Sequence, residues 1–209
     1  MSKILICDDH SAIRSGLKLI LQQEFEGARF GEASNALEVL KRLSEDHWDL
    51  LILDVDMPGR NGLEVLKQIK DEKINVRVLI FSMHPEEQIA VRALKLGAYG
   101  YLAKASADTE LIKAVEQILS GKKYITNSLA EQLAAQLENP SNKAPHEMLS
   151  EREYQTLLLI ASGKTISEIA EELSLSVPTV STYRARILEK TGMKTSAELT
   201  SYAVRNKLV

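Results

Sequence analysis

Hydrophobic residues in the first part of the chain form short continuous runs that alternate with amphipathic segments. The runs cover residues 4–7, 50–53, 76–81 and 99–102, and a weaker run covers residues 28–30. Between the runs, apolar residues recur at helical spacing at about 11–23, 35–45, 62–71, 86–96 and 108–120. Strands that alternate with helices of this length predict βαβ units and a parallel sheet. Because the strands are apolar throughout, both faces of this sheet should be covered.

A different pattern begins after residue 125. Leucines four residues apart predict a helix at 126–137, and a polar stretch with two prolines at 138–149 predicts a linker. Beyond it the strand pattern stops, and we expect four short helices at about 150–162, 166–173, 177–190 and 196–206. The sequence therefore predicts a domain at 1–124, a linker helix with a flexible linker at 125–148, and a small all-α domain at 149–209.

Composition narrows the class of protein. The chain has 209 residues, 44% of them hydrophobic and 26% charged, as expected of a folded soluble protein. No apolar run approaches 18 residues, and the short run at 4–7 meets two acids, so we expect no membrane span and no signal peptide. The single Cys7 fits a reducing, cytoplasmic location. With a net charge of −3, any nucleic-acid binding must come from a local basic patch.

Polar residues follow four of the predicted strands. Asp8, Asp9, Asp54, Ser82 and Lys104 stand at or just beyond strand ends, where sites form in open α/β sheets. One aspartate there is most simply a helix N-cap. Three converging carboxylates would repel one another, and Mg²⁺, which prefers oxygen ligands, is the natural compensation.

The chemistry that this acidic pocket permits is phosphoryl transfer. A carboxylate can accept a phosphoryl group as a nucleophile, while a metal ion and a lysine neutralise charge on the transferring oxygens. Asp54 is the best candidate because it ends the central strand and opens a loop that contains Pro58, Gly59 and Gly62. Ser82 is placed to hydrogen-bond a phosphate oxygen.

Residues 1–124 resemble the receiver domain of two-component response regulators. The matching pieces are Asp8-Asp9, Asp54, Met57-Pro58-Gly59 with Gly62, Ser82, and residues 97–104 ending in Lys104. The resemblance implies a flavodoxin-like, doubly wound, five-stranded parallel sheet. It also implies that Asp54 is the phosphoacceptor, and that Mg²⁺ is held by Asp9, Asp54, the backbone carbonyl of Asp56 and, through water, Asp8.

The same resemblance implies that Lys104 pairs with the phosphoryl group and that Ser82 and Tyr101 form a switch pair. Tyr101 is equally explained as a plain strand aromatic. One departure from the family pattern is Ala105, which stands where many receivers have a proline in a cis peptide. A cis bond before a residue other than proline costs about 3–4 kcal/mol, so this loop geometry is not carried over.

The predicted helices at 166–173 and 177–190, joined by a short turn, describe a helix-turn-helix. An ordinary α-hairpin gives the same pattern, but the faces of the second helix favour DNA binding. Val177, Val180, Ile187 and Leu188 form an apolar stripe, whereas the opposite face carries small and polar residues that suit a major groove. The candidate DNA contacts are Thr179, Ser181, Thr182, Tyr183, Arg184, Ala185, Arg186, Lys190 and Lys194.

Residues 149–208 resemble the LuxR-type DNA-binding domain. The match rests on residues 149–153, Ile166, residues 168–170, Leu173, Ser176-Val177, Thr179-Val180, Tyr183, and Lys190 before Gly192. A receiver followed by this domain is the NarL/FixJ class of response regulator. The resemblance implies a sensor histidine kinase, promoter DNA and a homodimer as partners, with RNA polymerase as a further one. It also suggests that the helix at 196–206 makes the dimer contact, although its apolar stripe serves equally to close the domain's own core.

Two alternatives remain at the level of sequence. The acidic pocket would also suit an Asp- and Mg²⁺-dependent phosphatase with Asp56 as general acid, but no insertion supplies a substrate-covering cap. The second alternative is a constitutive DNA-binding protein in which the receiver acts only as a dimerisation module. The expected function is a phosphorylation-controlled transcription regulator that is not an enzyme, beyond self-phosphorylation from small phosphodonors and autodephosphorylation.

Overall fold

The structure is a computed structural model that describes residues 1–138, 144–206 and 208–209, without the side chains of residues 87, 88, 108 and 135–138. It divides into two compact units, Met1–Leu133 and Ala134–Val209, each with its own core. The flexible linker expected within 138–149 falls partly on residues 139–143, which lie outside the described residues.

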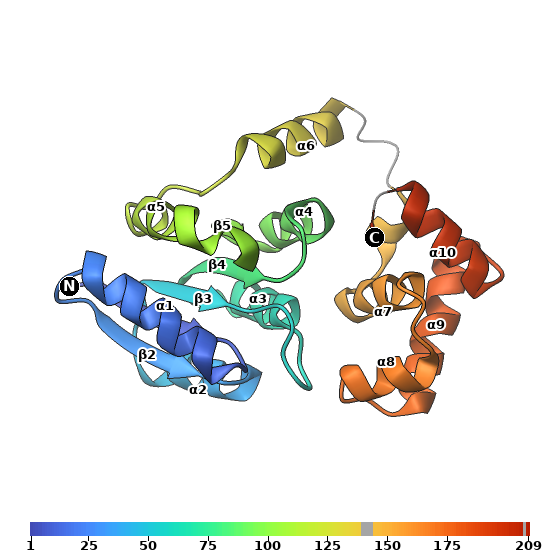
Figure 1. Ribbon diagram of the computed structural model, residues 1–209, viewed down its shortest axis with the longest axis horizontal. Coiled ribbons are helices and arrows are strands. Elements are labelled where there is room, and N and C mark those ends of the chain that lie inside the picture. Colours follow the sequence, from blue (N-terminus) through green and yellow to red (C-terminus); the bar gives the residue numbers. More distant parts are fainter. Residues whose placement is uncertain (139–143, 207) are drawn as a thin grey trace. The chain divides into compact units, whose positions relative to one another are not determined.

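The first unit alternates strands and helices as the hydrophobic pattern predicts (Figure 1). Its strands are β1 (Lys3–Cys7), β2 (Arg29–Ala33), β3 (Leu50–Leu53), β4 (Arg77–Ser82) and β5 (Gly100–Ala103). Its helices are α1 (Ser11–Glu24), α2 (Ala36–Glu45), α3 (Gly62–Asp71), α4 (Glu86–Leu96), the 3-10 turn η1 (Lys104–Ser106), α5 (Ala107–Leu119) and most of α6 (Asn127–Glu138). The weak run at 28–30 underestimates β2, which continues to Ala33. As an edge strand that is only partly covered, β2 includes Gly31 and Glu32 and lacks a continuous apolar run.

The five strands form one parallel sheet in the order β2-β1-β3-β4-β5, which confirms the doubly wound fold. Residues of α1 and α5, among them Leu17 and Val115, pack against Ile4, Ile52 and Phe81 on one face of the sheet. Helix α3 packs between α2 and α4 and contacts both of them. Strand order reverses between β1 and β3, and a crevice opens beyond the carboxyl ends of strands at such a point.

The second unit contains the four predicted helices, α7 (Glu151–Ala161), α8 (Ile166–Glu172), α9 (Val177–Thr191) and α10 (Ser196–Arg205). They are preceded by the 3-10 turn η2 (Pro145–Met148), which lies within the segment predicted as a linker. Helix α7 packs against α9 and α10, and α8 packs against α9. The core is formed by apolar side chains from all four helices, including Leu157, Ile169, Val180, Ile187 and Leu199. Within the described residues, no helix has the length and apolar character needed to cross a membrane.

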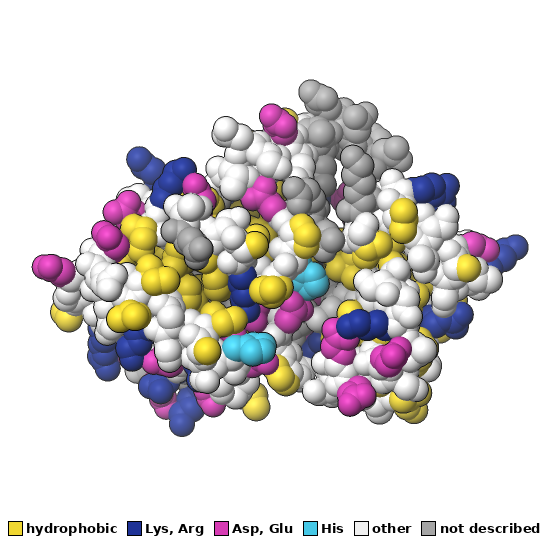
Figure 2. Space-filling model, in the orientation of Figure 1, with side chains coloured by type: hydrophobic (Ala, Val, Ile, Leu, Met, Phe, Trp, Pro, Cys, Tyr) yellow, Lys and Arg dark blue, Asp and Glu magenta, His cyan; other side chains and the backbone are white. Residues whose placement is uncertain are grey.

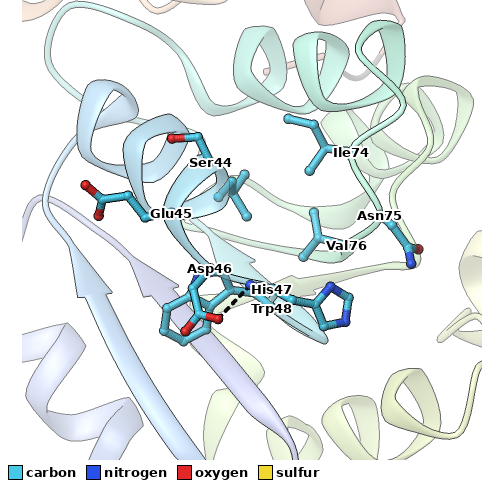
Figure 3. Close-up of a pocket in the computed structure, with 9 residues that line it drawn as sticks. Ser44, Glu45, Asp46, His47, Trp48, Ile74, Asn75 and Val76 are labelled. Atoms are coloured by element: carbon cyan, nitrogen blue, oxygen red, sulfur yellow. Dashed lines mark hydrogen bonds between the residues drawn. The ribbon is translucent and has the colours of Figure 1, made fainter.

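A pocket of about 430 Å³ opens at the amino-terminal edge of the sheet, before β3 and β4 (Figure 3). Residues 43–48 and 74–76 line it. There the backbone N–H of His47 donates a hydrogen bond to Asp46 Oδ1 at 2.8 Å, beside Trp48. Because the predicted polar residues follow the carboxyl ends of the strands, none of them lines this pocket.

Candidate functional site

Strand register explains why three charged residues meet beyond the sheet. Cys7 pairs with Leu53, so Asp8 and Asp54 follow neighbouring positions on β1 and β3. Lys104 follows directly after β5. Its ammonium Nζ lies 2.6 Å from Asp8 Oδ2 and 2.8 Å from Asp54 Oδ2. The structure therefore brings together residues that are 96 and 50 positions apart in the chain.

This acidic pocket is almost closed to solvent. The side chains of Asp8, Asp54 and Lys104 are 1%, 2% and 8% exposed, respectively. The Lys104 ammonium also lies over the ring of Phe81, 5.7 Å from its centroid. Two carboxylates and one ammonium in low dielectric leave an excess of negative charge, which a further cation would offset.

Burial raises the pKa of Asp54 to about 6, although the hydrogen bond and charge of Lys104 act to lower it. The negative charges of Asp8 and Asp56 add to the rise. Burial alone would lower the pKa of Lys104, but its hydrogen bonds to Asp54 and Asp8 raise that pKa above its ordinary value. Lys104 is therefore a permanent cation in the pocket, while Asp54 is held closer to neutrality than an ordinary aspartate.

The loop between β3 and α3 is folded tightly onto Asp54. A side-chain carbon on Gly62 would lie 2.0 Å from the backbone oxygen of Asp54, so only glycine fits at this position. Asn61 caps α3 by accepting a hydrogen bond from the backbone N–H of Leu63 at 2.7 Å. The backbone N–H of Asp56 lies 3.3 Å from Asp54 Oδ1, so the two oxygens of Asp54 have different donors.

The residues present fit a divalent cation. Asp8, Asp9 and His10 each offer a ligand atom, and these atoms lie within 4.8 Å of one another. Asp9 Oδ1 is buried and accepts no hydrogen bond from the described part of the chain, although His10 Nδ1 lies 2.7 Å from it. Oxygen ligands with an uncompensated carboxylate suit Mg²⁺. Sequence reasoning overlooked His10, whose position directly after two aspartates was the available signal.

Ser82 and Tyr101 meet beside the pocket. Both are buried, and burial raises the pKa of Tyr101 well above its ordinary value, despite an opposing hydrogen bond with Ser82. The Tyr101 hydroxyl donates to the carbonyl oxygen of His84 at 2.6 Å, and the N–H of His84 donates to Ser82 Oγ at 3.2 Å. The His84 ring lies 3.0 Å from the carboxylate of Asp56. His84 thus joins the two predicted switch residues to the loop after Asp54, a role that its place two residues beyond Ser82 only hints at.

Ala105 does not displace the lysine. The Lys104–Ala105 peptide bond is trans, and Lys104, Ala105 and Ser106 form the turn η1. With this trans peptide, the Lys104 ammonium still reaches Asp8 and Asp54.

Helix α9 presents small side chains to solvent. It starts at a Ser176 cap, which accepts from the N–H of Thr179 at 3.3 Å, and ends at Gly192, whose φ of 71° suits glycine. Ser181, Thr182, Ala185 and Arg186 are exposed, as the helical period predicts. Val177 is a correction, because it is 46% exposed and does not belong to the apolar stripe. It lies in the first turn, where the helix extends beyond its packing partners.

Two of the other predicted DNA contacts, Lys190 and Arg184, have side-chain partners within the unit. The Lys190 ammonium lies 2.6 Å from Oε2 of Glu153, whose side chain is 3% exposed. Arg184 Nε donates to Ser196 Oγ at 2.8 Å, in keeping with a partly buried stem. Thr179 and Tyr183 are half-buried, whereas Lys194 is exposed. The structure thus gives Lys190 a stabilising role that the sequence did not suggest.

The surfaces next to α9 differ from it in character. Helix α8 exposes Glu168, Glu171 and Glu172, and Figure 2 shows acidic side chains over this helix. In α10, the apolar stripe of Leu199, Tyr202 and Ala203 is buried in the unit's own core. Any dimer contact by α10 must therefore use its outer face, where Val204 is exposed.

Two family models match this chain, one within each compact unit. Residues 4–116 match the family model described as "Response regulator receiver domain". Residues 147–203 match the model described as "Bacterial regulatory proteins, luxR family". The first match covers the acidic pocket, and the second covers α7, α8 and α9 and most of α10.

Relatives match over the whole chain. Response regulator UvrY of Escherichia coli (strain K12) is 35% identical over 210 residues, covering 100% of this chain and 96% of that protein. Response regulator GacA of Pseudomonas aeruginosa is 35% identical over 211 residues, covering 100% and 98%. A solved structure of RcsB from Salmonella enterica serovar Typhimurium, bound to promoter rprA in the presence of the phosphomimetic BeF3−, is 26% identical. It covers 98% of this chain and 99% of its own, with a TM-score of 0.65.

Proposed function

The chain belongs to the response regulators with a receiver domain and a LuxR-type DNA-binding domain, and from this we propose that phosphorylation of Asp54 controls its binding to promoter DNA. The observation that carries the proposal is the buried cluster in which Lys104 Nζ lies 2.8 Å from Asp54 Oδ2 and 2.6 Å from Asp8 Oδ2. We assign residues 1–124 to the receiver, 149–209 to the DNA-binding domain, and 125–148 to the linker.

The phosphoryl group comes from the phosphohistidine of a sensor kinase or from a small phosphodonor. A carboxylate oxygen of Asp54 forms the new bond to phosphorus while the bond to the donor breaks, and the donor leaves with its electron pair. Lys104 stays protonated because its carboxylate partners raise its pKa. Its ammonium is therefore ready to pair with the phosphoryl oxygens as their charge develops. Hydrolysis of the acyl phosphate later restores the carboxylate.

Asp9 and Asp54, the backbone carbonyl of Asp56, and Asp8 through water would hold Mg²⁺ in this pocket. When bound, the ion supplies positive charge opposite the transferring oxygens. The buried Asp9 Oδ1, which accepts no hydrogen bond within the described ranges and lies 2.7 Å from His10 Nδ1, supports this assignment. The imidazole of His10 adds a neighbouring ligand atom.

Ser82 and Tyr101 would carry the signal away from Asp54. Ser82 Oγ accepts from the backbone N–H of His84, and the carbonyl of His84 accepts from Tyr101, so a Ser82 hydroxyl that turns toward a phosphoryl oxygen would disturb this chain of hydrogen bonds. Tyr101 also holds the carbonyl of His84, in the segment that leads into α4. The face formed by α4 and β5 would then repack.

In the DNA-binding domain, α9 would enter the major groove as the recognition helix. RcsB structures include complexes described as dimers bound to two parallel DNAs. We propose that this chain likewise binds promoter sites as a homodimer in the cytoplasm, with RNA polymerase as a further partner. Arg186 and Lys194, which are exposed, would contact phosphates beside the groove.

Acetyl phosphate with Mg²⁺, followed by intact mass, tests the proposal. The wild-type protein should gain the mass of one phosphoryl group, and Asp54→Asn should gain none. Asp56→Asn serves as the matched control, because its backbone carbonyl is retained and its side chain faces His84. A phosphorylated Asp54→Asn protein, modified on Asp8 or Asp9, would contradict the assignment. Phosphorylation that leaves DNA affinity unchanged would contradict the control of DNA binding.

A further inference from the structure

The exposed surface at the start of α9 consists largely of carbon. We call it the outer face of α9 and define it by Val177, Pro178, Ser181, Thr182 and Ala185, all of which are exposed. These residues are spaced three, four and seven apart, so they lie on one side of the first turns. Val177 alone leaves 46% of its surface in solvent.

Thr182 offers a methyl group more readily than a hydroxyl. Its Oγ1 donates a hydrogen bond to the carbonyl oxygen of Pro178 at 2.9 Å, one turn earlier in the same helix. This bond ties the hydroxyl to the helix backbone and leaves the γ-methyl as the group directed away from it. Among the five residues of the outer face, Ser181 is then the one with a hydroxyl not turned back in this way.

Two long polar side chains near this face are held within the unit, whereas Arg186 and Glu189 beside it are exposed. Arg184 donates to Ser196, and Lys190 pairs with Glu153 on α7. None of the five residues of the outer face carries an amide or guanidinium group, so the bidentate hydrogen bonds by which arginine, asparagine or glutamine read guanine and adenine cannot come from it. What this face presents to a base edge is mainly methyl and methylene groups.

The apolar feature of the major groove is the C5-methyl group of thymine. We propose that Val177, Thr182 and Ala185 read thymine methyl groups, so that the binding sites of this protein are double-stranded half-sites with thymines placed opposite the first turns of α9. This inference rests on the proposed function, in which α9 enters the major groove. It adds the chemical feature that α9 recognises there.

The test uses full-length protein treated with acetyl phosphate and Mg²⁺, and a duplex selected by it from a random pool. A second duplex carries deoxyuridine for every thymidine, which removes the methyl groups but keeps base pairing and hydrogen-bond acceptors. Fluorescence anisotropy at one salt concentration should show weaker binding of the uracil duplex, by roughly fourfold for each thymine methyl group that the outer face packs against.

Two substitutions separate the methyl group from the hydroxyl of Thr182. Thr182→Ser keeps the hydroxyl and removes the methyl, and it should lose roughly fourfold on the thymine duplex and little on the uracil duplex. Thr182→Val keeps a methyl and removes the hydroxyl, and it should retain affinity for thymine. Equal binding of the two duplexes by the wild type would overturn the inference, as would a greater loss by Thr182→Val than by Thr182→Ser.

Ala185→Glu distinguishes this failure from that of the proposed function. A carboxylate at this exposed position should abolish binding to any duplex if α9 lies in the groove. Ser167→Glu on α8, also at an exposed position, is the matched control. If Ala185→Glu binds as well as Ser167→Glu, or if no sequence is enriched from the pool, both the groove placement and the methyl readout are wrong. If Ala185→Glu abolishes binding but uracil has no effect, only the methyl readout is wrong.

Discussion

The acidic pocket and the outer face of α9 meet opposite physical demands. The pocket collects Asp8, Asp54 and Lys104 from the ends of three strands and removes them from water. The outer face comes from one helix, is exposed, and carries small side chains. A change in the pocket should therefore alter stability as well as chemistry, whereas a change on the outer face should alter binding alone. Four experiments test this contrast, from the largest expected effect to the smallest.

Removing the pocket cation should give the largest effect. Lys104→Met leaves Asp8 and Asp54 buried without their partner, so we expect the free energy of unfolding at pH 8 to fall by about 3–5 kcal/mol. The loss should shrink at pH 5, because Asp54, with a pKa of about 6, is then largely protonated in the folded protein. Urea unfolding without Mg²⁺ measures this free energy from the fluorescence of Trp48. Trp48 is the single tryptophan and is buried in the receiver.

Lys113→Met is the matched control for this experiment. Lys113 makes an exposed ion pair with Glu110 at 3.3 Å, and its loss should cost less than about 1 kcal/mol. A Lys104→Met protein that unfolds like Lys113→Met would show that the pocket carboxylates do not depend on the lysine for stability.

The second experiment concerns Lys190 of α9, whose ammonium pairs with the buried Glu153. Because the Lys190 side chain is 39% exposed and Glu153 keeps its hydrogen bond from the N–H of Ser150, we expect Lys190→Ala to cost about 1–2 kcal/mol in the DNA-binding unit. Lys194→Ala, at an exposed position, should leave stability unchanged and reduce the salt dependence of DNA binding by about one phosphate contact. Calorimetry of both variants decides it, while Trp48 fluorescence should report an unaltered receiver. If the two variants have the same stability, the buried pair contributes nothing.

The third experiment measures proton competition in the pocket. The raised pKa of Asp54 means that the folded protein binds a proton at this group as the pH falls through about 6. Because Mg²⁺ needs the carboxylate, its dissociation constant should rise about tenfold for each pH unit below that value, or about 1.4 kcal/mol. Isothermal titration calorimetry from pH 8 to pH 5 measures the slope. In Asp54→Asn the slope should flatten, and a wild-type constant independent of pH would place Mg²⁺ away from Asp54.

The smallest expected effect lies in the turn between α8 and α9. Ser174 has a positive φ of 53°, which costs an L-residue about 1–2 kcal/mol. Ser174→Gly relieves this strain but adds freedom to the unfolded chain, so we expect a gain below about 1 kcal/mol. Gly192→Ala, at a φ of 71°, should have the opposite sign. Thermal unfolding of both variants compares them, and a destabilising Ser174→Gly would mean that the turn depends on the serine side chain.

The sequence by itself determined the elements and the chemistry. Because βαβ units alternate at fixed lengths, runs of apolar residues specify the order of strands and helices. Carboxylates after β1 and β3 and a lysine after β5 specify a polar crevice at the sheet's carboxyl edge. The 3.6-residue period likewise placed Ser181, Thr182 and Ala185 on one exposed side of α9.

Only the tertiary structure decided which side chains meet. His84 contacts Asp56, 28 residues earlier in the chain, and Tyr101, 17 residues later. Lys190 pairs with Glu153, 37 residues earlier. No local sequence pattern encodes contacts over such separations. Burial, too, depends on neighbours from elsewhere in the chain. Val177 has the spacing of a core residue yet lies beyond its packing partners, whereas Asp54, a polar residue at a strand end, is enclosed enough for its pKa to rise to about 6. Periodicity is a property of one segment, but desolvation and ion pairing are properties of the segments that pack around it.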